Sequence, residues 1–421
     1  MRARRDRPAV TLFVSVLAAL AAAPSLAGGF AIFEQSARAM GLAGAMTADS
    51  ESPSALFYNP ASGAFQETSY AAGALARASW DLTYDSQPEA AVATRFAQDD
   101  PDVLPYAYTV QTLKPYLKLG VAVYQPFSHQ AGWSNVDDFP GRAISYSSQI
   151  DALDVNPSVA VRFKSGLALG VGAVYRTADV TLARRLETTD PLTSETVDFA
   201  DFAVDSGQEP GFGWNVGVLY RAGDRFSWGF SYRSAVEIDF GGSGLLTQIA
   251  TGNTDLDDLL ALTNPFDQEL AAASTVEFPD VASFGVAVGS AERLRVALDV
   301  NWTGWSSFQQ LRTVIPEFPL YSQTIDQQLD DALSFRVGVQ WGVASKTVLR
   351  FGYAFDQTPQ PDAAVGPFFF DADRNTLALG FGRDWLDVAV EWVSYSSRAD
   401  GSGIGGSFAG EAVQASISVK F

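Results

Sequence analysis

Within the last eleven residues of the chain, 411–421, apolar and polar side chains alternate from Val413 to the end. Val413, Ile417 and Val419 share one side of an extended strand with the terminal Phe421, while serine, glutamine and lysine residues occupy the other side. A tilted strand of this length crosses roughly 30 Å of hydrocarbon. A single strand of this kind is also compatible with the edge of a soluble sandwich, so the rest of the chain must decide between the two folds.

The same alternation recurs in thirteen earlier segments, which gives fourteen in all. In one of them Phe335, Val337 and Trp341 share a face opposite Arg336 and Gln340. Short turns and long polar loops alternate between the segments, as in bacterial outer-membrane barrels, whereas a soluble sandwich has no reason to sort its loops by length. We therefore predict an all-β fold, a 14-stranded antiparallel transmembrane β-barrel. The predicted strands are 69–84, 106–114, 116–127, 143–163, 167–186, 210–222, 225–240, 276–289, 293–312, 333–343, 346–358, 371–383, 385–397 and 411–421.

A barrel of this size encloses a lumen that its own side chains cannot fill, because eight strands already nearly exhaust close packing. Residues 28–68 are the predicted plug, or hatch, since small residues dominate there and strand alternation is absent. Short helical turns are predicted at 35–40 and 53–58. On the outside of the barrel, aromatic residues near strand ends are predicted to form girdles at the membrane surfaces. These residues are Trp302, Trp305, Tyr353 and Trp392.

The N-terminus has the features of an export signal. Four arginines precede an apolar run at 9–23, and Ser25-Leu26-Ala27 is a small-x-small cleavage site. No other stretch offers eighteen consecutive apolar residues, so helical membrane spans are not expected. We predict a signal peptide at 1–27, the hatch at 28–68 and the barrel at 69–421.

The formal net charge of −20 disfavours nucleic acid as a partner. Much of the acid lies in predicted loops, for example at 99–102 and 255–258. Solvated loops explain this pattern, calcium sites are the alternative, and no spacing matches an EF-hand loop. The chain has no cysteine, which excludes disulfides and thiolate metal sites. We predict neither a metal nor a cofactor.

Several motifs follow one another along the chain in a fixed order. The segment after the signal contains E-Q-S-A-R-A-M-G-L-A-G-A and then S-A-L-F-Y-N-P-A, and further motifs lie at Trp214–Gly242, Phe278–Val286, Ala297–Phe308 and Leu349–Pro359. Together they resemble the FadL-type outer-membrane transporter family, which takes up long-chain fatty acids and other hydrophobic compounds. The resemblance covers nearly the whole mature chain.

The resemblance implies a fourteen-stranded barrel closed by an N-terminal hatch that carries the motif Asn59-Pro60-Ala61. It also implies capture of the ligand in an apolar groove among extracellular loops and transfer to a lumenal pocket touched by the mature N-terminus. The ligand then leaves sideways into the membrane. Phe30, Ile32 and Phe33 are accordingly predicted to bind the ligand.

An apolar ligand with a carboxylate needs an apolar cavity and one or two cationic or hydrogen-bonding groups. Arg176 is the candidate cation, because it points inward from an otherwise apolar-faced strand. Its surroundings, A-V-Y-R, resemble the family strand that bears a basic ligand-contacting residue, with an offset of one residue. The alternative is that Arg176, like the inward-facing Arg336 and Arg350, pairs with carboxylates of the lumen. Those carboxylates are Asp299, Asp356, Asp387 and Glu391.

The predicted loop 241–275 is unusually rich in aliphatic residues. Leu256, Leu259, Leu260 and Phe266 approximate one face of a short helix pair broken near Asn264-Pro265. So much aliphatic surface on an extracellular loop suits a ligand groove, and packing between loops is the alternative.

No residues are organised for catalysis in the sequence. The one histidine, His129, lies in a predicted loop and would have to serve without a visible partner. We predict a monomeric passive transporter and no enzyme. Its predicted partners are a hydrophobic small molecule, outer-membrane lipid and lipopolysaccharide. Long-chain fatty acids are the first candidate cargo, monoaromatic hydrocarbons are the alternative, and a structural or adhesive barrel is the alternative from another class.

Overall fold

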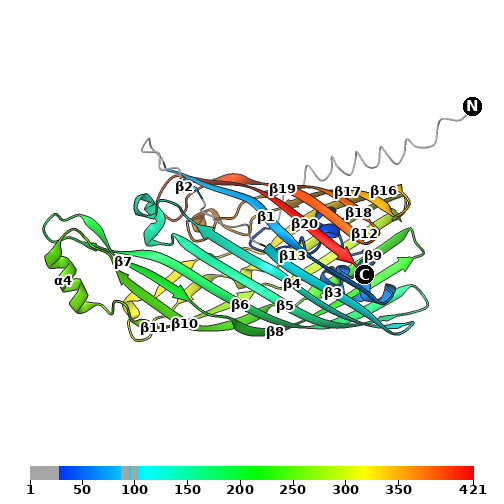
Figure 1. Ribbon diagram of the computed structural model, residues 1–421, viewed down its shortest axis with the longest axis horizontal. Coiled ribbons are helices and arrows are strands. Elements are labelled where there is room, and N and C mark those ends of the chain that lie inside the picture. The colour runs from blue at the N-terminus through cyan, green and yellow to red at the C-terminus, as the bar shows by residue number, and fades with distance from the viewer. Residues whose placement is uncertain (1–27, 87–93, 96–102) are drawn as a thin grey trace, which may run out of the picture.

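A closed antiparallel β-barrel makes up most of the molecule (Figure 1). The computed structural model describes residues 28–86, 94–95 and 103–421, so the predicted signal peptide at 1–27 lies outside the described residues. The last strand, β20, pairs with the first, β1, from Ala71 opposite Lys420 to Asp85 opposite Ser407, and this pairing closes the sheet. The strands are β1 (Ser69–Asp85), β2 (Thr94–Arg95), β3 (Val103–Lys114), β4 (Leu117–Gly132), β5 (Ser147–Arg162), β6 (Leu167–Thr189), β7 (Thr196–Asp205), β8 (Glu209–Ala222), β9 (Phe226–Arg233), β10 (Val236–Gln248), β11 (Glu269–Phe278), β12 (Val281–Ser290), β13 (Leu294–Thr303), β14 (Gln310–Thr313), β15 (Gln323–Asp326), β16 (Ala332–Ala344), β17 (Thr347–Asp356), β18 (Arg374–Arg383), β19 (Leu386–Ala399) and β20 (Ser407–Lys420).

The barrel wall has fourteen strand positions, as the sequence predicted. Three positions are each divided by a short interruption, at 206–208 between β7 and β8, at 234–235 between β9 and β10, and at 279–280 between β11 and β12. Long loops mark the extracellular end of an outer-membrane barrel, and short turns mark the periplasmic end. β2 pairs with the extracellular end of β1, and β14 and β15 form a separate hairpin. These three short strands therefore do not add to the wall.

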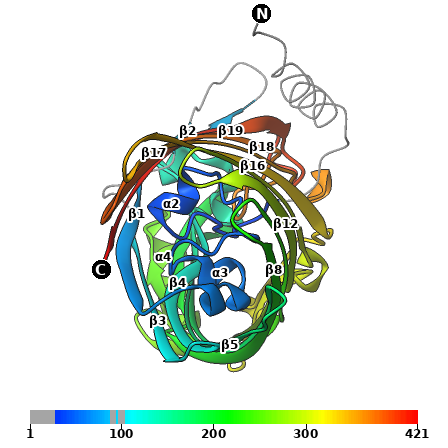
Figure 2. The same ribbon diagram turned by 90° about the vertical axis from the view of Figure 1, so that its right-hand side faces the viewer.

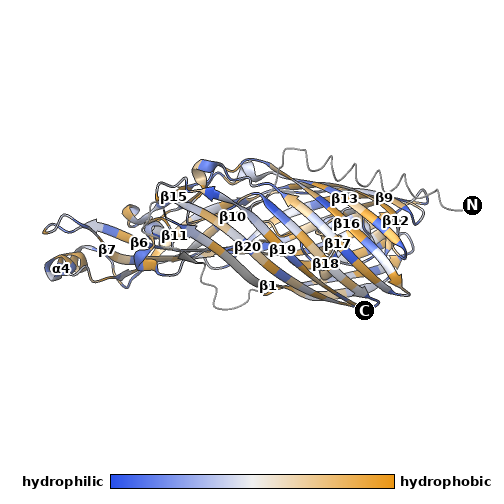
Figure 3. Cartoon of the chain, turned by 90° about the horizontal axis from the view of Figure 1, so that it is seen from above, coloured by the Kyte–Doolittle hydropathy of each residue, from blue (hydrophilic) through white to orange (hydrophobic). Residues whose placement is uncertain are grey.

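Side chains of the wall alternate between an exposed apolar outer face and a buried polar inner face. On β13, for example, Leu294 and Leu298 are exposed, whereas Arg295 and Asp299 are buried. Hydrophobic and hydrophilic residues accordingly alternate along the strands in Figure 3. This is the pattern expected when lipid lies outside the barrel and a polar lumen lies inside.

One of the four residues predicted for the aromatic girdles lies elsewhere. Trp302 and Trp392 share the outer faces of their strands with exposed aliphatic residues, and Trp392 is itself exposed. Trp305 is completely buried, so that prediction was wrong. β13 ends at Thr303, and the short 3-10 helix η4 (Trp305–Ser307) turns the chain into the lumen.

Residues 28–68 lie inside the barrel, where Figure 2 shows their short helices surrounded by the wall. The helical turns predicted at 35–40 and 53–58 are confirmed as α2 (Ala37–Met40) and α3 (Ala55–Tyr58), and the 3-10 helix η1 (Pro60–Phe65) follows. Small residues on both sides permit this fit. A methyl group added at Gly170, Gly229 or Gly352 of the wall would collide with backbone of this segment.

Several strands extend further than the sequence predicted. β7 lies within the predicted loop 187–209, and β10 and β11 continue into the predicted loop 241–275. Outward positions of β11 alternate with a buried face but carry polar or small residues, such as Glu269, Thr275 and Glu277. Beyond the membrane the outer face meets water, so the alternation of apolar and polar residues that identifies a spanning strand is lost there.

Helices are few and short. α4 (Thr254–Thr263) begins at Asn253, whose side chain accepts a hydrogen bond from the Leu256 amide, and ends at Asn264. The chain then enters β11, so the second helix of the predicted pair is absent. None of the helices in the described ranges is long and apolar enough to cross a membrane. The remaining 3-10 helices are η2 (Val136–Asp138), η3 (Pro140–Ala143), η5 (Pro319–Tyr321) and η6 (Asp362–Ala364).

Candidate functional site

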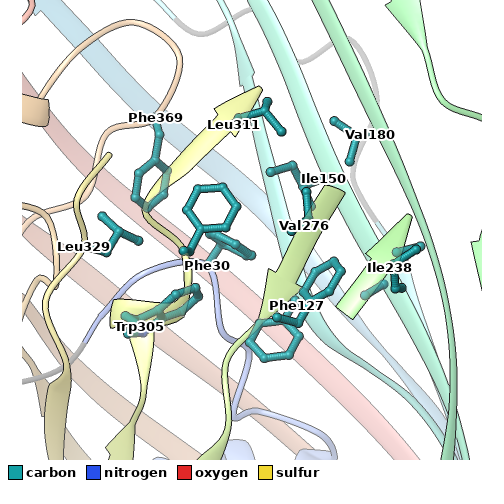
Figure 4. Packing of buried hydrophobic residues seen from close by; sticks show 14 of the residues in the cluster. Phe30, Phe127, Ile150, Val180, Ile238, Val276, Trp305, Leu311, Leu329 and Phe369 are labelled. Atoms are coloured by element: carbon teal, nitrogen blue, oxygen red, sulfur yellow. The ribbon is translucent and has the colours of Figure 1, made fainter. Parts of the chain in front are cut away.

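An apolar cluster fills the lumen on the extracellular side of the hatch, and Phe30 lies at its centre (Figure 4). The Phe30 ring is 5% exposed and makes edge-on contacts with the rings of Trp305, Phe308, Phe369 and Phe127, at centroid distances of 4.6, 5.6, 5.8 and 5.9 Å. We call this group the lumenal cluster. Its members are Phe30, Phe127, Ile150, Ala152, Ala178, Val180, Leu182, Val236, Ile238, Phe240, Val276, Phe278, Trp305, Phe308, Leu311, Ile325, Leu329, Ala332, Phe368 and Phe369.

The chain around Phe30 is added to the free edge of β4. The ladder between β3 and β4 ends at Val123, and a break in register follows at 125–126. Beyond the break, the Ile32 amide donates to the Pro126 carbonyl at 2.8 Å, and the Ser128 amide donates to the Phe30 carbonyl at 3.1 Å. The N-terminal segment thus supplies the hydrogen-bonding partner that β3 does not provide.

Two loops of the extracellular side hold the start of the hatch. The Gly29 amide donates to Asp371 Oδ2 at 2.8 Å, and Trp305 Nε1 donates to the Gly28 carbonyl at 3.1 Å. Burial raises the pKa of Asp371. Gly29 has a φ of +76°, and a side chain there would overlap the Trp305 ring, so this position requires glycine.

Two small cavities flank Ala31 and Ile32. One, of about 40 Å³, is lined by apolar residues of the hatch and by Phe127 and Arg233. The other, of about 50 Å³, has a more polar lining that includes His129. Drug-sized ligands occupy pockets of roughly 300–1,000 Å³, so a long ligand fits here only after side chains of the lumenal cluster move aside.

Arg176 is fully buried beside the lumenal cluster. Its Nε and Nη2 donate to the two carboxylate oxygens of Asp154 at 2.7 and 2.9 Å, which is bidentate geometry. The guanidinium lies 4.8 Å from the Phe127 ring centre and 5.0 Å from that of Phe278. Within the described residues Arg176 Nη1 has no hydrogen-bond partner, although a buried donor without a partner is costly. Arg176 therefore has one donor available to a ligand.

Arg336 and Arg350 have the carboxylate partners that the alternative interpretation named. Arg336 Nη2 donates to Asp356 at 2.7 Å, and its Nη1 donates to Glu34 of the hatch at 3.2 Å. Arg350 Nη1 donates to Asp387 at 2.7 Å. Arg336 thus links the hatch to the wall.

The motif Asn59-Pro60-Ala61 lies where the hatch meets the wall. The Asn59 side chain accepts a hydrogen bond from the Ala61 amide at 3.0 Å and donates to the carbonyls of Thr47 and Val218 at 3.1 and 3.0 Å. This side chain connects two parts of the hatch to β8.

The predicted residues of loop 241–275 lie at the opposite end of the site. Leu256 is buried, Leu260 and Phe266 pack against an extracellular cluster, and Leu259 is 56% exposed. The structure does not bring these residues to Phe30, since α4 lies at the far end of the molecule from the hatch (Figure 1). The extracellular cluster consists of Phe199, Ala200, Phe202, Leu246, Leu270, Ala272, Ile315 and Tyr321.

A third small cavity, of about 20 Å³, lies between the two clusters. Its lining includes Val180 and Phe240 of the lumenal cluster and Ala272 of the extracellular cluster. The two apolar regions are therefore neighbours along the barrel axis.

His129 is not in a loop, as the sequence had predicted, but buried on β4. Its Nε2 lies 3.0 Å from the Phe368 carbonyl and 3.3 Å from Ser148 Oγ, while Ser148 itself donates to the Phe368 carbonyl at 2.7 Å. The serine proton is thus directed away from the histidine, which does not suit a nucleophile and base. In the described part of the chain no group of histidine and acidic residues is arranged to hold a metal.

Comparisons with known proteins agree on one family. The family profile described as "Outer membrane protein transport protein (OMPP1/FadL/TodX)" matches residues 18–395. The long-chain fatty acid transport protein of Escherichia coli K12 is 25% identical over 319 residues, which cover 64% of this chain and 68% of that protein. Outer membrane protein P1 of Haemophilus influenzae is 25% identical over 304 residues, covering 66% and 61%.

Solved structures show the same fold. A Pseudomonas aeruginosa FadL homologue superposes with a TM-score of 0.79 at 20% identity and covers 94% of this chain and 99% of that one. The Ralstonia pickettii toluene transporter TbuX superposes with a TM-score of 0.65 at 17% identity, covering 93% and 98%.

Proposed function

Because the chain belongs to the outer membrane protein transport family (OMPP1/FadL/TodX), whose members carry hydrophobic compounds across the outer membrane, we propose that its cargo is a long-chain fatty acid. One observation carries this proposal. At the border of an otherwise apolar cluster, Arg176 presents a buried donor, Nη1, that has no hydrogen-bond partner among the residues that the structure describes. A fatty acid matches that combination, since its chain replaces apolar side chains and its carboxylate accepts the free hydrogen bond.

Capture begins on the extracellular side. Leu259 and Leu262 of α4 are 56% and 86% exposed, which is unusual for aliphatic residues on one short helix. Leu260 of the same helix packs against the extracellular cluster, and the 20 Å³ cavity lies between that cluster and the lumenal one. A ligand that moves from α4 through the extracellular cluster to the lumenal cluster therefore stays in contact with apolar side chains throughout.

Binding in the lumen displaces Phe30, because the lumenal cluster leaves no room for a long acyl chain beside it. Movement of Phe30 pulls on its neighbours, and the hydrogen bonds from Ile32 to Pro126 and from Ser128 to Phe30 break. The edge of β4 is then free. We assign the sideways exit to this edge, between β3 and β4.

A charge-neutral pair of substitutions tests the cargo. Arg176→Gln combined with Asp154→Asn removes the Arg176 cation and its carboxylate together. Arg233, which also donates to Asp154 at 3.3 Å, keeps its hydrogen bond to the Phe57 carbonyl. Palmitate and toluene are then supplied in radiolabelled form to cells that lack other transporters of this family. We expect palmitate uptake to fall by a factor set by ~1.5–3 kcal/mol, the strength of a hydrogen bond to a charged group, and toluene uptake to stay unchanged. Equal losses for both compounds, or no palmitate uptake by the parent protein, refute the proposal.

Monoaromatic hydrocarbons are the second candidate. The rings of Phe127, Trp305, Phe308 and Phe369 all contact the Phe30 ring, so its position is lined by four aromatic side chains. A toluene-sized molecule could replace the Phe30 ring without further rearrangement. Toluene uptake by the parent in the absence of palmitate uptake would favour this function.

A further inference from the structure

The periplasmic end of the barrel is basic, although the chain as a whole has a formal net charge of −20. Six short turns join the wall strands at this end, between β3 and β4, β5 and β6, β8 and β9, β12 and β13, β16 and β17, and β18 and β19. Each turn carries an exposed basic residue, and together these residues form what we call the basic rim. They are Lys114, Lys164, Arg225, Arg293, Lys346 and Arg383.

A large apolar side chain is exposed within three residues of every member of the basic rim. These side chains are Tyr116, Phe163, Phe226, Leu294, Val343 and Trp385, and between 39 and 59% of each is exposed. At the first turn the Lys114 ammonium lies 5.9 Å from the centre of the Tyr116 ring. Aromatic residues at the ends of spanning strands mark the level of the lipid headgroups. The basic rim therefore lies at the height of the phosphates in the periplasmic leaflet.

Backbone hydrogen bonds hold neighbouring turns side by side. The Arg162 amide of the second turn donates to the Tyr116 carbonyl of the first at 2.9 Å. The Gly289 amide, just before the fourth turn, donates to the Arg225 carbonyl of the third at 2.8 Å. Lipid that surrounds the barrel therefore meets a basic residue at each successive hairpin.

Charge compensation is weakest at the first two turns, 111–117 and 162–167, which contain no acidic residue. Within the described residues neither Lys114 nor Lys164 forms an ion pair. Glu67, which precedes β1, is paired with Lys118 at 3.5 Å. The other turns are partly neutralised by acidic residues of this end, which are Asp224, Glu292 and Asp384. The first two turns therefore attract anions most strongly.

We propose that the basic rim binds acidic phospholipids of the periplasmic leaflet, with Lys114 and Lys164 as the principal contacts. The ammonium groups attract the lipid phosphate, and the apolar side chains beside them lie among the first carbons of the acyl chains. Phosphatidylglycerol has a net negative charge, whereas phosphatidylethanolamine is neutral overall, so the rim enriches phosphatidylglycerol around the periplasmic mouth. Each basic residue near an acidic lipid surface increases binding about fivefold. The inference does not depend on which cargo the protein carries.

An acidic protein of the periplasm is the other partner that a basic surface could take. Lipid is favoured because the exposed rings of Tyr116, Phe163, Phe226 and Trp385 lie on the same turns as the basic residues. Rings at this level are covered by the membrane itself. The basic residues beside them are therefore held against lipid headgroups rather than presented to the periplasm.

A fluorophore on the wall between the first two turns measures the lipid that gathers there. Leu119 is exposed on the outer face of β4, opposite Gln111 of β3 and Val159 of β5. Leu119→Cys provides a single thiol for the label, because the chain has no cysteine. The labelled protein is placed in phosphatidylcholine vesicles that contain a minor fraction of brominated phosphatidylglycerol or brominated phosphatidylethanolamine. Quenching by the two lipids at equal mole fraction gives their relative association with the site.

We expect phosphatidylglycerol to associate about fivefold more strongly at low salt, and the preference to shrink at high salt, which screens the charges. Lys114→Gln/Lys164→Gln should bring the two lipids within about twofold of each other. Lys114→Arg/Lys164→Arg is the matched control, since it keeps both charges and should retain the preference. A label at Tyr175→Cys, on the outer face of β6 away from these turns, is the reference and should report no preference.

Equal quenching by the two lipids in the labelled parent overturns the proposal. A preference that survives Lys114→Gln/Lys164→Gln, in a barrel with normal heat-modifiable mobility in gels, overturns it as well. If the lipids quench equally but soluble polyglutamate binds the purified parent and not the glutamine variant, the rim is assigned to an acidic protein instead.

Discussion

Replacement of Phe30 by alanine should release the N-terminal segment from the lumen without unfolding the barrel. The ring is 5% exposed and contacts four other rings edge-on. Truncation of a phenylalanine in such packing costs about 3–5 kcal/mol. The hydrogen bonds between the strands of the wall are unaffected. The lost free energy therefore weakens the docking of the segment around Gly28–Ile32 and leaves the stability of the barrel unchanged.

A single cysteine reports the docking. Ala31→Cys places a thiol between the two cavities beside Phe30, and the chain contains no other thiol to compete. Since each 1.4 kcal/mol is a factor of ten, a loss of about 3 kcal/mol should accelerate maleimide labelling at this position about 100-fold. Labelling is measured in purified protein before and after Phe30→Ala.

Phe212→Ala is the matched control, because it removes the same ring from a position that is 76% exposed on the outer face. It should leave the labelling rate unchanged. If Phe30→Ala also leaves the rate within about twofold of the parent, the ring does not hold the segment, and the magnitude worked above from its contacts is refuted.

The remaining predictions concern closure of the lumen, measured as ion conductance in planar bilayers. Deletion of 28–61 should give a large, steady conductance in a barrel that still assembles, and an unchanged conductance would show that this segment does not close the lumen. Arg336→Met leaves the carboxylates of Glu34 and Asp356 buried without their cation, a loss of about 3–5 kcal/mol, so it should raise conductance, whereas Arg383→Met at an exposed turn should not. Burial alone would raise the pKa of Asp49, but Arg38 and Arg295 lower it to about 2. This ion pairing therefore stabilises the hatch fully above pH ~4, and the stabilisation is lost as the pH falls towards 2. Acidification from pH 4 to pH 2 should raise the ion conductance of the parent protein. It should not further raise the conductance of Asp49→Asn, in which the ion pair is already absent.

The fold was predictable because one period governs every spanning strand. The outer face must be apolar and the inner face polar, so alternation identified all fourteen wall positions. The alternation is lost where that constraint ends. β7 and the extracellular parts of β10 and β11 were missed, since both of their faces tolerate polar or small residues beyond the membrane.

The site was predictable only in part. Phe30 lies in the lumenal cluster, but its ring partners come from β4 and from the loops after β13 and β17, whose meeting no local pattern reveals. Trp305 was predicted to be a girdle residue because it lies two residues beyond the end of β13, where the membrane surface is expected. The chain turns into the lumen at η4, so the side chain is buried there instead. The pairing of Asp154 with Arg176 was accessible from sequence, since the tight turn at 164–166 fixes the register that puts them opposite each other.

The glycines of the wall that face the hatch make the inner surface of the barrel complementary in shape to the backbone of the hatch. Gly170, Gly229 and Gly352 accept main-chain atoms of residues 42–61 at distances that no other side chain permits. Such a fit forms most readily while the wall is still open, because a finished cylinder offers no wide opening through which to thread a folded segment. Residues 28–68 precede β1 in the chain, and β1 meets β20 last of all in sequence order. We therefore expect the wall to assemble around the hatch, which is synthesised first. The hatch would then act as a template for barrel assembly in addition to closing the lumen.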